Sequence, residues 1–558
     1  MKLKPTRLFL VFLATLFLVN LLQSHFTELL FDEAYYWHYA SRLSWGYFDH
    51  PPMVALLIKV SGWLFRGELG VRFMSCVLSA GTLVILWNIV EDKRKQDYIP
   101  HFFVLVLSMT LLHAYGFFTL PDTPLLFFTA MFLWLYQHFL HKATIPLSIG
   151  LGLVMAGLMY SKYHAVLVIL CVLASNIRLV LNPHAWLAVA VALFSYFPHL
   201  AWLYEHDFVS IRYHLFERPN RAYDFNDFTL GFFINLLAIF GLTFPWIYQS
   251  LFKTRSKDRF TRALLFLVYG VLVFFFVSSF QRRVQTQWII VVSIPMAVIA
   301  FRYMLEHPAA RTWILRAGVA NLVILAYLRV GLIYEPLFPI VFETHGNKEW
   351  VQQVQAVAGE RPVVFENSYR EAPMYAFYSG HPSYSLNNVF YRENQYNIDG
   401  TEAQLQGKEV LYIAKRFKEG DMSYTIANGN RYYGKFIEDF ESYRELECRV
   451  EMPVRTPDEV ALLIKVYNPY QQNIPLTKLK FGTAYLNRYK EVKDFSPATV
   501  VPADTTTTVL MAKDSTEFYL QLPQPEIQSP SYFRLAISDN GLFWGINSEN
   551  IKLEAWNP

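Results

Sequence analysis

One short stretch, residues 31–52, follows the first apolar run of the chain and is dense in acidic and aromatic residues. Asp32 and Glu33 stand near its start, and Asp49 and His50 stand at its end, directly before two prolines. A carboxylate placed beside a substrate hydroxyl group takes its proton as a general base. The stretch therefore holds the first candidates for a catalytic site, and capping of a short helix by Asp32 is the competing interpretation.

Aromatic side chains fill the space between the two acidic ends of this stretch. Tyr35 and Tyr36 follow the first acidic pair after one alanine. An aromatic face stacks on the apolar face of a sugar ring, so both residues are candidates for a sugar-binding wall. The same residues are expected in the aromatic belt of a membrane interface whatever the function.

Cationic residues recur in loops farther along the chain. Lys162 and Tyr163 lie in the turn "SKYH", Arg218 lies in the loop 205–228, and Arg282 and Arg283 lie in "QRRVQTQW". Arginine binds two phosphate oxygens with its fork, and lysine binds phosphate as a point charge. The alternative is that these side chains extend towards lipid head groups.

A carboxylate facing cations fits the transfer of a sugar from a polyprenyl phosphate, because the base takes the acceptor proton and the cations stabilise the departing phosphate. Asp122 in "TLPDTP" begins an expected helix and is either its cap or a further site group. Asp32, Glu33, Asp49, His38 and His50 also include enough oxygen and nitrogen donors for a divalent metal ion. The proposed chemistry needs no metal, so we expect no required cofactor and leave a divalent metal as the alternative.

These loops must be positioned by membrane helices. The chain has 558 residues, of which 54% are hydrophobic and 17% charged, which is typical of a membrane protein. About eleven segments are long enough to cross a bilayer. They lie near residues 8–23, 70–90, 99–115, 122–140, 145–160, 163–181, 185–204, 229–251, 261–280, 288–304 and 312–334.

The basic residues predict the orientation of these segments. Lys2, Lys4, Arg7 and the cluster 93–95 fall in alternate loops, which all lie on the cytoplasmic side if the N-terminus does. The first segment lacks the small-residue cleavage pattern of a signal peptide, so we interpret it as an uncleaved helix. The net charge is only +4 and the basic residues form no continuous face, which argues against a nucleic-acid partner.

The character of the chain changes near residue 340. Residues 341–424 show helical and buried-strand patterns, which predict a small α/β domain. Residues 425–558 show alternating strand patterns with turns, which predict a β-sandwich. The expected organisation is a membrane domain at 1–340, with an amphipathic external loop at 24–69, followed by these two domains.

A set of motifs in this order resembles the bacterial members of glycosyltransferase family 39, which are membrane enzymes of the C-type fold related to protein O-mannosyltransferases and to the aminoarabinose transferase of lipid A. The motifs are the Asp32-Glu33 stretch, "YFDHPP", "ELGVR", "PDTPLLFF", "SKYHAVL" and "RRVQTQW". The likeness covers roughly residues 8–335. It implies a polytopic helical membrane protein of the bacterial inner membrane with a periplasmic C-terminal region.

The resemblance also implies roles for individual residues. Asp32 matches the catalytic base, with Glu33 adjacent to it, and Asp49 matches a second carboxylate of the site. Asp122 matches the acidic residue of the second external turn. His50 stands where the aminoarabinose transferases have a lysine.

The donor phosphate of the family is bound by basic residues. Lys162 and Tyr163 match a Lys-Tyr element near this phosphate, and Arg282 or Arg283 matches the basic residue before the late helix. Here "QTQW" departs from the family form, which leaves open which arginine binds.

The hypothesis is therefore an inverting, single-displacement glycosyltransferase. Its donor is a polyprenyl-phosphate sugar, and its acceptor is a protein, a lipid or a glycan. The rivals are a transporter or flippase for polyprenyl-linked lipids, whose ionisable groups should lie near the middle of its helices, and a polysaccharide ligase that uses the same type of donor.

Overall fold

The computed structural model describes residues 4–455 and 460–553, so Lys2 lies outside the described residues. The chain divides into two compact units. The first, called the membrane unit, comprises Met1–Phe208 and Tyr223–His345. The second, called the C-terminal unit, comprises Val209–Ala222 and Gly346–Pro558.

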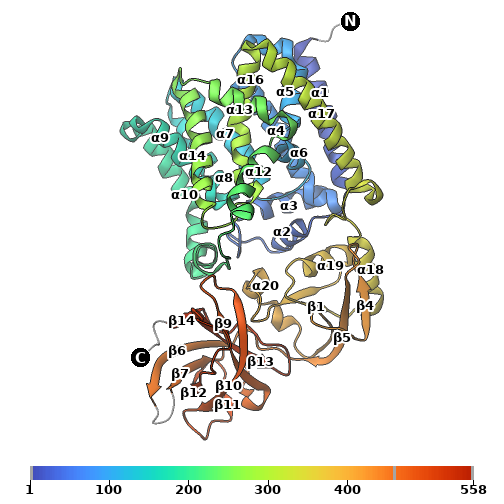
Figure 1. Cartoon of the computed structure of the whole chain (residues 1–558), viewed down its shortest axis with the longest axis vertical. Helices are drawn as coiled ribbons and strands as arrows, with labels where there is room; N and C mark the ends of the chain where they lie inside the picture. Colours follow the sequence, from blue (N-terminus) through green and yellow to red (C-terminus); the bar gives the residue numbers. More distant parts are fainter. Residues whose placement is uncertain (1–3, 456–459, 554–558) are drawn as a thin grey trace. The chain divides into compact units, whose positions relative to one another are not determined.

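The membrane unit is built from helices (Figure 1). Within the described residues, seven helical stretches are long and apolar enough to cross a membrane, and a pair bent by 93° between α12 and α13 makes up to eight. The α-helices of this unit are α1 Pro5–Phe26, α2 Phe31–Ser41, α3 Met53–Leu64, α4 Gly67–Ile89, α5 Ile99–Leu107, α6 Thr110–Ala114, α7 Asp122–His141, α8 Ile145–Ser161, α9 Val166–Ser175, α10 Pro183–Glu205, α12 Gly231–Ala238, α13 Phe244–Lys253, α14 Arg259–Ser278, α15 Thr286–Ile289, α16 Ser293–Glu306 and α17 Pro308–Ile333.

The apolar segments expected from the sequence all fall on helical residues, and the polytopic helical fold class is confirmed. Four of them are shorter or broken. The segment at 99–115 is divided between α5 and α6, and the segment at 229–251 is bent by 93° between α12 and α13. Helix α8 has 17 residues, and the segment at 163–181 contains the ten-residue α9 between two 3-10 turns. Apolar composition predicts these helices, but it does not predict where their backbones break.

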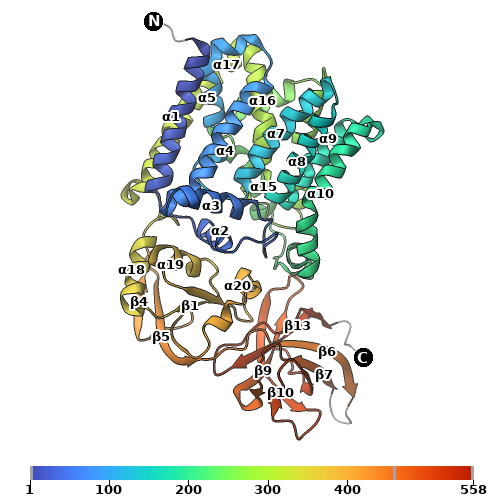
Figure 2. The same ribbon diagram turned by 180° about the vertical axis from the view of Figure 1, so that it is seen from behind.

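Two short helices carry the candidate stretch. The turn after α1 leads to α2, and Pro51 and Pro52 precede α3, as the amphipathic pattern of the sequence predicts. In Figure 2 both helices run across the ends of the long helices rather than alongside them. The cap of α2 differs from the expected one, because Asp32 lies inside the first turn and the Glu33 carboxylate accepts a hydrogen bond from the Leu30 N–H group, at 3.0 Å.

The C-terminal unit begins with an open sheet of five strands in the order β2-β1-β3-β5-β4. Strand β1 is parallel to β2 and β3, with Val364 opposite Tyr384 and Tyr412, and β5 is antiparallel to β3 and β4. The elements are α18 Asn347–Ala358, β1 Val363–Glu366, α19 Glu371–Ser379, β2 Ser383–Leu386, α20 Gln395–Ile398, β3 Lys408–Ala414, β4 Met422–Thr425 and β5 Arg431–Phe440. This sheet extends beyond residue 424, where the sequence places a domain boundary.

The second sheet has seven strands in the order β14-β13-β9-β10-β12-β7-β6, and a two-stranded ribbon joins β11 to β8. Its core contains Ile464, Phe481, Leu520 and Phe533, all nearly inaccessible. The strands are β6 Glu447–Arg455, β7 Val460–Tyr467, β8 Ile474–Pro475, β9 Leu479–Leu486, β10 Val492–Pro502, β11 Val509–Leu510, β12 Ser515–Gln521, β13 Tyr532–Asp539 and β14 Ile551–Lys552. The β-rich character of the C-terminal region is therefore confirmed, and its division into domains stays a prediction.

One segment of the expected membrane domain groups with the C-terminal unit. This segment, residues 209–222, is called the strap. It contains α11 Val209–Arg212 and one π-helical turn, Tyr213–Glu217. The Arg212 guanidinium lies 2.9 Å from the carboxylate of Glu549, and the Asn220 N–H group donates to the Tyr489 carbonyl oxygen at 2.9 Å.

Candidate active site

A buried ion pair fixes the start of α2. The Arg72 side chain on α4 donates from Nε to Glu33 Oε1 at 2.8 Å and from Nη2 to Glu33 Oε2 at 2.5 Å, and both side chains are fully buried. The Thr119 N–H group donates to Oε1 at 2.7 Å, and the Leu30 N–H group donates to Oε2. Four hydrogen bonds thus occupy the Glu33 carboxylate, which suits a residue that positions its neighbours better than one that accepts a substrate proton.

Arg72 itself ties three parts of the membrane unit together. Its remaining N–H groups donate to the carbonyl oxygens of Ser24, Thr27 and Glu28, at 3.1, 2.6 and 2.8 Å. Arg72 belongs to the motif "ELGVR", but we predicted no role for it from the sequence. The available signal was an arginine within an apolar helix, since a buried charge requires a partner.

Asp32 occupies the first turn of α2, directly before the buried Glu33, and its side chain is half-buried. After burial, the charges of Asp122 and Asp32 both raise the pKa of Tyr115, which lies between α6 and α7 in the chain.

The loop that carries Asp49 and His50 packs against the aromatic face of α2. The Tyr36 and His50 rings lie 5.5 Å apart, and the Tyr39 and Tyr47 rings stack at 4.2 Å. Asp49 is 8% exposed and contributes, after burial and Tyr35, to raising the pKa of Tyr39 well above its ordinary value. The loop is therefore held against α2, and Asp32 and Asp49 belong to one folded stretch.

Tyr35 and Tyr36, the candidate sugar wall, are buried, with exposed fractions of 2% and 6%. The Tyr35 ring contacts Tyr39, with the centroids 4.7 Å apart. In this structure both residues act in the packing of α2.

Lys162 and Asp122 form a second buried pair. Lys162 ends α8 and Asp122 begins α7, and the Lys162 ammonium group donates to both carboxylate oxygens, at 2.7 and 2.8 Å. The two predicted site residues are thus brought together. The carboxylate neutralises part of the lysine charge and holds the lysine in one position.

Tyr163 links the same turn to helix α10. Its ring lies 5.7 Å from the ring of His199, whose Nδ1 lies 2.6 Å from the carbonyl oxygen of Trp45. His199 is fully buried. The turn 162–163, α10 and the loop between α2 and α3 therefore form one continuous set of contacts.

The remaining predicted cations lie on other elements. Arg282 is half-buried and Arg283 is exposed, and both lie in the turn between α14 and α15. Asn235 fixes this turn, because its side chain accepts a hydrogen bond from Thr286 Oγ1 at 2.7 Å and donates one to the Val284 carbonyl oxygen at 2.9 Å. Arg218 lies in the strap and belongs to the C-terminal unit. The sequence places Arg218 in a loop between two apolar segments, and this position does not predict that Arg218 belongs to the C-terminal unit.

Among residues 4–455 and 460–553, no three His, Cys, Asp or Glu side chains gather in an arrangement that could hold a metal ion. Glu33, one of the five possible donors in the first loop, is occupied by Arg72. That the reaction requires no metal, with a divalent metal ion as the alternative, stays a prediction.

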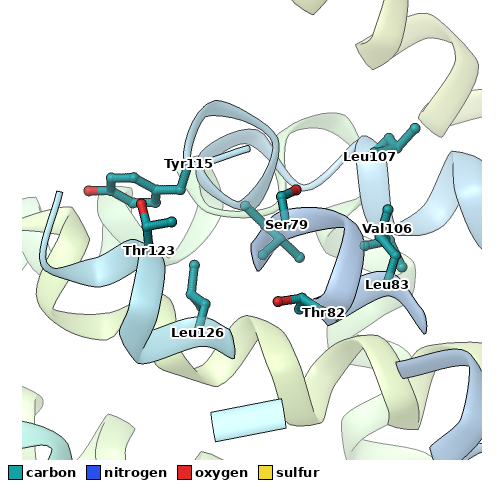
Figure 3. Close-up of a pocket in the computed structure, with 9 residues that line it drawn as sticks. Ser79, Thr82, Leu83, Val106, Leu107, Tyr115, Thr123 and Leu126 are labelled. Carbon is teal, nitrogen blue, oxygen red and sulfur yellow. The ribbon is translucent and has the colours of Figure 1, made fainter. Parts of the chain in front are cut away.

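A small cavity lies beside the start of α7 (Figure 3). Tyr115 and Thr123 lie close together at one side of the cavity. Its other lining residues include Ser79, Thr82 and Leu126. Its volume of about 20 Å³ holds roughly one water molecule. A cavity of this size cannot receive a sugar.

Comparison with known proteins agrees with this architecture. A family model described as "Dolichyl-phosphate-mannose-protein mannosyltransferase" matches residues 49–202, which include Asp49, Asp122 and Lys162 but not Asp32. The lipid A galacturonosyltransferase RgtD of Rhizobium johnstonii is 23% identical over 300 residues, which cover 51% of this chain and 63% of that protein.

Two solved structures share the fold. ArnT from Cupriavidus metallidurans in the apo state gives a TM-score of 0.55 at 12% identity, over 76% of this chain and 97% of that chain. The same protein bound to undecaprenyl phosphate gives 0.56 at 14% identity, with the same coverage.

The fold and the loop residues thus define a multi-pass membrane protein of the C-type glycosyltransferase fold. The resemblance to the bacterial members of glycosyltransferase family 39, drawn from the sequence motifs, is confirmed by the family model, the curated relative and the ArnT structures.

Proposed function

We propose that this protein is a membrane glycosyltransferase that moves a sugar from a polyprenyl-phosphate donor to an acceptor hydroxyl group. The observation that carries the proposal is the arrangement around α2. Asp32 stands half-buried directly before Glu33, which pairs with Arg72, and the charges of Asp32 and of Asp122, the partner of Lys162, both act on Tyr115. The family model, RgtD and the ArnT structure bound to undecaprenyl phosphate support this class of reaction and donor.

In the proposed mechanism, Asp32 removes the proton of the acceptor hydroxyl group. The resulting oxygen attacks the anomeric carbon of the donor, and the bond from that carbon to the phosphate oxygen breaks with its electron pair leaving on the phosphate. A single displacement of this kind inverts the anomeric configuration. Glu33 holds Asp32 in place, and Asp49 is the second carboxylate at the acceptor.

Cations stabilise the departing polyprenyl phosphate in this proposal. Lys162, held by Asp122, and Tyr163 are its first candidates. Arg282 and Arg283 are the second candidates for binding this phosphate. They lie in the turn before α15, where the sequence from 279 to 287 contains no acidic residue. Arg218 stays a candidate only if the strap reaches the donor.

The alternation of basic loops supports an orientation in which the N-terminus is cytoplasmic. The proposed site then lies at the periplasmic face of the bacterial inner membrane, and the C-terminal unit lies in the periplasm. Protease treatment of spheroplasts checks this arrangement, since only a periplasmic C-terminal unit is cleaved while the inner membrane stays intact.

The test compares Asp32→Asn, Asp49→Asn and the matched control Asp97→Asn, which changes an exposed aspartate in the loop before α5. The purified proteins in nanodiscs receive a polyprenyl-phosphate sugar and a mixture of glycan and lipid acceptors, and the released polyprenyl phosphate is measured. We expect Asp32→Asn to lower turnover at least about 100-fold, because a general base contributes on this order, while Asp97→Asn keeps full turnover. Near wild-type turnover in folded Asp32→Asn would falsify the assignment of the base.

A further inference from the structure

A larger cavity lies among four helices of the membrane unit. Helices α7, α8, α9 and α10 lie together on one side of this unit (Figure 2). The cavity between them has a volume of about 120 Å³, and its lining includes Phe139 on α7, Met155 on α8, Val172 on α9 and Ala185 on α10. Protein interiors contain few voids larger than a water molecule. The packing of the helices alone therefore does not explain a space of this size.

The lining of this cavity is apolar. Among the residues that line it, only Tyr136 and Trp186 carry a side-chain nitrogen or oxygen atom, and both atoms have a protein partner. The Asn176 side chain donates to the Tyr136 hydroxyl group at 3.4 Å, and Trp186 Nε1 donates to the Val180 carbonyl oxygen at 2.9 Å. A buried water molecule needs two to four polar partners, whereas an apolar cavity of about 150 Å³ takes up benzene. The lining therefore suits a hydrocarbon.

The cavity reaches the outer surface of the helices. Trp186 and Val180 both line it, and they are 58% and 42% exposed. Trp186 lies in the first turn of α10, and α7 and α10 are long and apolar enough to cross a membrane. In a bilayer, the outer surface of such helices contacts lipid chains, which are as apolar as leucine side chains. The mouth of the cavity is therefore open to lipid near the point where α10 enters the membrane.

The charge beside this mouth is positive. Arg178 is exposed and belongs to the 3-10 turn Ile177–Leu181, which supplies part of the lining. The sequence between Asp122 and Glu205 contains no acidic residue, so α8, α9 and the turn carry no carboxylate. Basic residues between transmembrane helices bind the head groups of anionic lipids.

One carboxylate approaches this group of helices from another element. Glu91, in the loop after α4, lies 4.0 Å from Nε2 of His141 at the end of α7. The end of α7 therefore already has an anion beside it. For this reason we assign the head group of the lipid to Arg178, on the turn between α9 and α10.

The cavity is separate from the candidate active site. The Asp122–Lys162 pair joins the start of α7 to the end of α8, whereas Phe139 lies in the last turn of α7. At 1.5 Å per residue, Asp122 and Phe139 are roughly 25 Å apart along the helix. A head group beside Arg178 therefore belongs to a lipid other than the sugar donor.

We propose that the cavity between α7, α8, α9 and α10 holds an acyl chain of an anionic phospholipid whose phosphate group binds Arg178. The chain enters beside Trp186 and contacts the apolar lining, while the head group stays at the membrane surface. The proposal does not depend on the transfer reaction, because binding alone defines the site.

The experiment maps the site in the full-length protein purified in detergent. The probe is phosphatidylglycerol that carries a photoreactive diazirine at the end of one acyl chain, and mass spectrometry of the digested protein locates the crosslinks. Unlabelled phosphatidylglycerol, phosphatidylcholine and a polyprenyl phosphate serve as competitors.

Two variants, each with a matched control, test the cavity and the charge separately. Ala185→Leu adds three carbon atoms to the lining, and Ala190→Leu makes the same change at an exposed position of α10. Arg178→Gln removes the charge beside the mouth, and Arg255→Gln changes an exposed arginine in the loop between α13 and α14. Thermal unfolding shows whether each variant stays folded.

We expect the crosslinks to fall on the segments of α7 to α10 that line the cavity. Phosphatidylglycerol should displace the probe at a concentration about tenfold lower than phosphatidylcholine, since a hydrogen bond to a charged group is worth roughly that factor. Arg178→Gln should weaken labelling by about the same factor. Ala185→Leu should abolish labelling, because its side chain takes the space of the acyl chain, and both controls should label like the wild type.

Crosslinks that fall on other segments of the wild type overturn the site, and so does unchanged labelling in folded Ala185→Leu. Equal displacement by phosphatidylcholine overturns the role of the anionic head group. If a polyprenyl phosphate displaces the probe at a lower concentration than phosphatidylglycerol, the cavity holds the tail of the sugar donor and the proposal is wrong. If Ala185→Leu does not fold, the wild-type crosslinks and Arg178→Gln decide.

Discussion

Two neighbouring acidic residues have different roles in this structure. Glu33 is buried and accepts four hydrogen bonds, two of them from Arg72. Asp32, one position earlier, is half-buried in the first turn of α2. A motif shared with a family identifies the pair, but only the burial and the partners distinguish the positioning residue from the candidate base.

Arg72→Met should destabilise the membrane unit because it leaves the Glu33 charge buried without its cation. Breaking one partner of a buried pair costs about 3 to 5 kcal/mol, so the melting temperature in detergent should fall. Thermal unfolding followed by tryptophan fluorescence measures this change.

Arg94→Met is the matched control for this prediction. Arg94 pairs with Asp92 at 2.6 Å on an exposed turn, so its loss should change the melting temperature little. If Arg72→Met and Arg94→Met have the same melting temperature, the buried pair does not stabilise the unit.

At the scale of elements, the loop between α2 and α3 depends on a close approach to α10. A Cβ atom added to Gly46 would lie 2.1 Å from Cε3 of Trp202. His199, one turn earlier on α10, contacts the carbonyl oxygen of Trp45. Only a residue without a side chain allows the loop that carries Asp49 to lie against this helix.

Gly46→Ala should therefore displace the loop and lower transferase activity. Overpacking of this kind costs about 1 to 3 kcal/mol, and the displaced Asp49 should reduce turnover more than it reduces donor binding. Turnover and donor affinity measured on the same nanodisc preparation check the split.

Gly150→Ala on α8 provides the comparison, since its nearest neighbour, Leu135 Cδ1, lies 3.8 Å from the added Cβ atom. This variant should be neutral or slightly stabilising. Equal activity of Gly46→Ala and Gly150→Ala would show that the loop tolerates the shift.

At the scale of the whole molecule, the C-terminal unit contains carboxylates whose burial is costly. Burial, together with Glu217, raises the pKa of Glu393, and burial, together with Glu549, raises that of Glu217. The folded unit then holds protons that the unfolded chain has released. The contribution of these two groups to its stability is therefore fully present below the ordinary glutamate pKa of about 4.3 and is lost as pH rises through the raised values.

Glu393→Gln should remove part of this dependence. We expect the variant to melt higher than the wild type at pH 8 and to approach it at pH 4.5, because the amide carries no buried charge. Differential scanning calorimetry across this pH range measures the effect. A difference in melting temperature that is constant with pH would contradict the assignment of the proton to Glu393.

Much of the helical fold follows from the sequence, because long apolar segments have one stable structure in a bilayer. The short helices α2 and α3 follow from proline, helix-capping and amphipathic signals. The partners of Arg72 and Lys162 do not follow, since they come from segments 39 and 40 residues away in the chain. The grouping of the strap with the C-terminal unit depends on contacts such as that of Arg212 with Glu549, which no local pattern records.

The strap also sets an order for biosynthesis. Residues 209–222 leave the ribosome before the helices from α12 to α17, while the rest of the unit to which they belong starts at Gly346. Domains generally fold as units during synthesis. The C-terminal unit needs the strap as well as the segment that starts at Gly346, so this segment alone does not complete it. The strap must wait, joined at both ends to membrane helices, until the last strands have been translated.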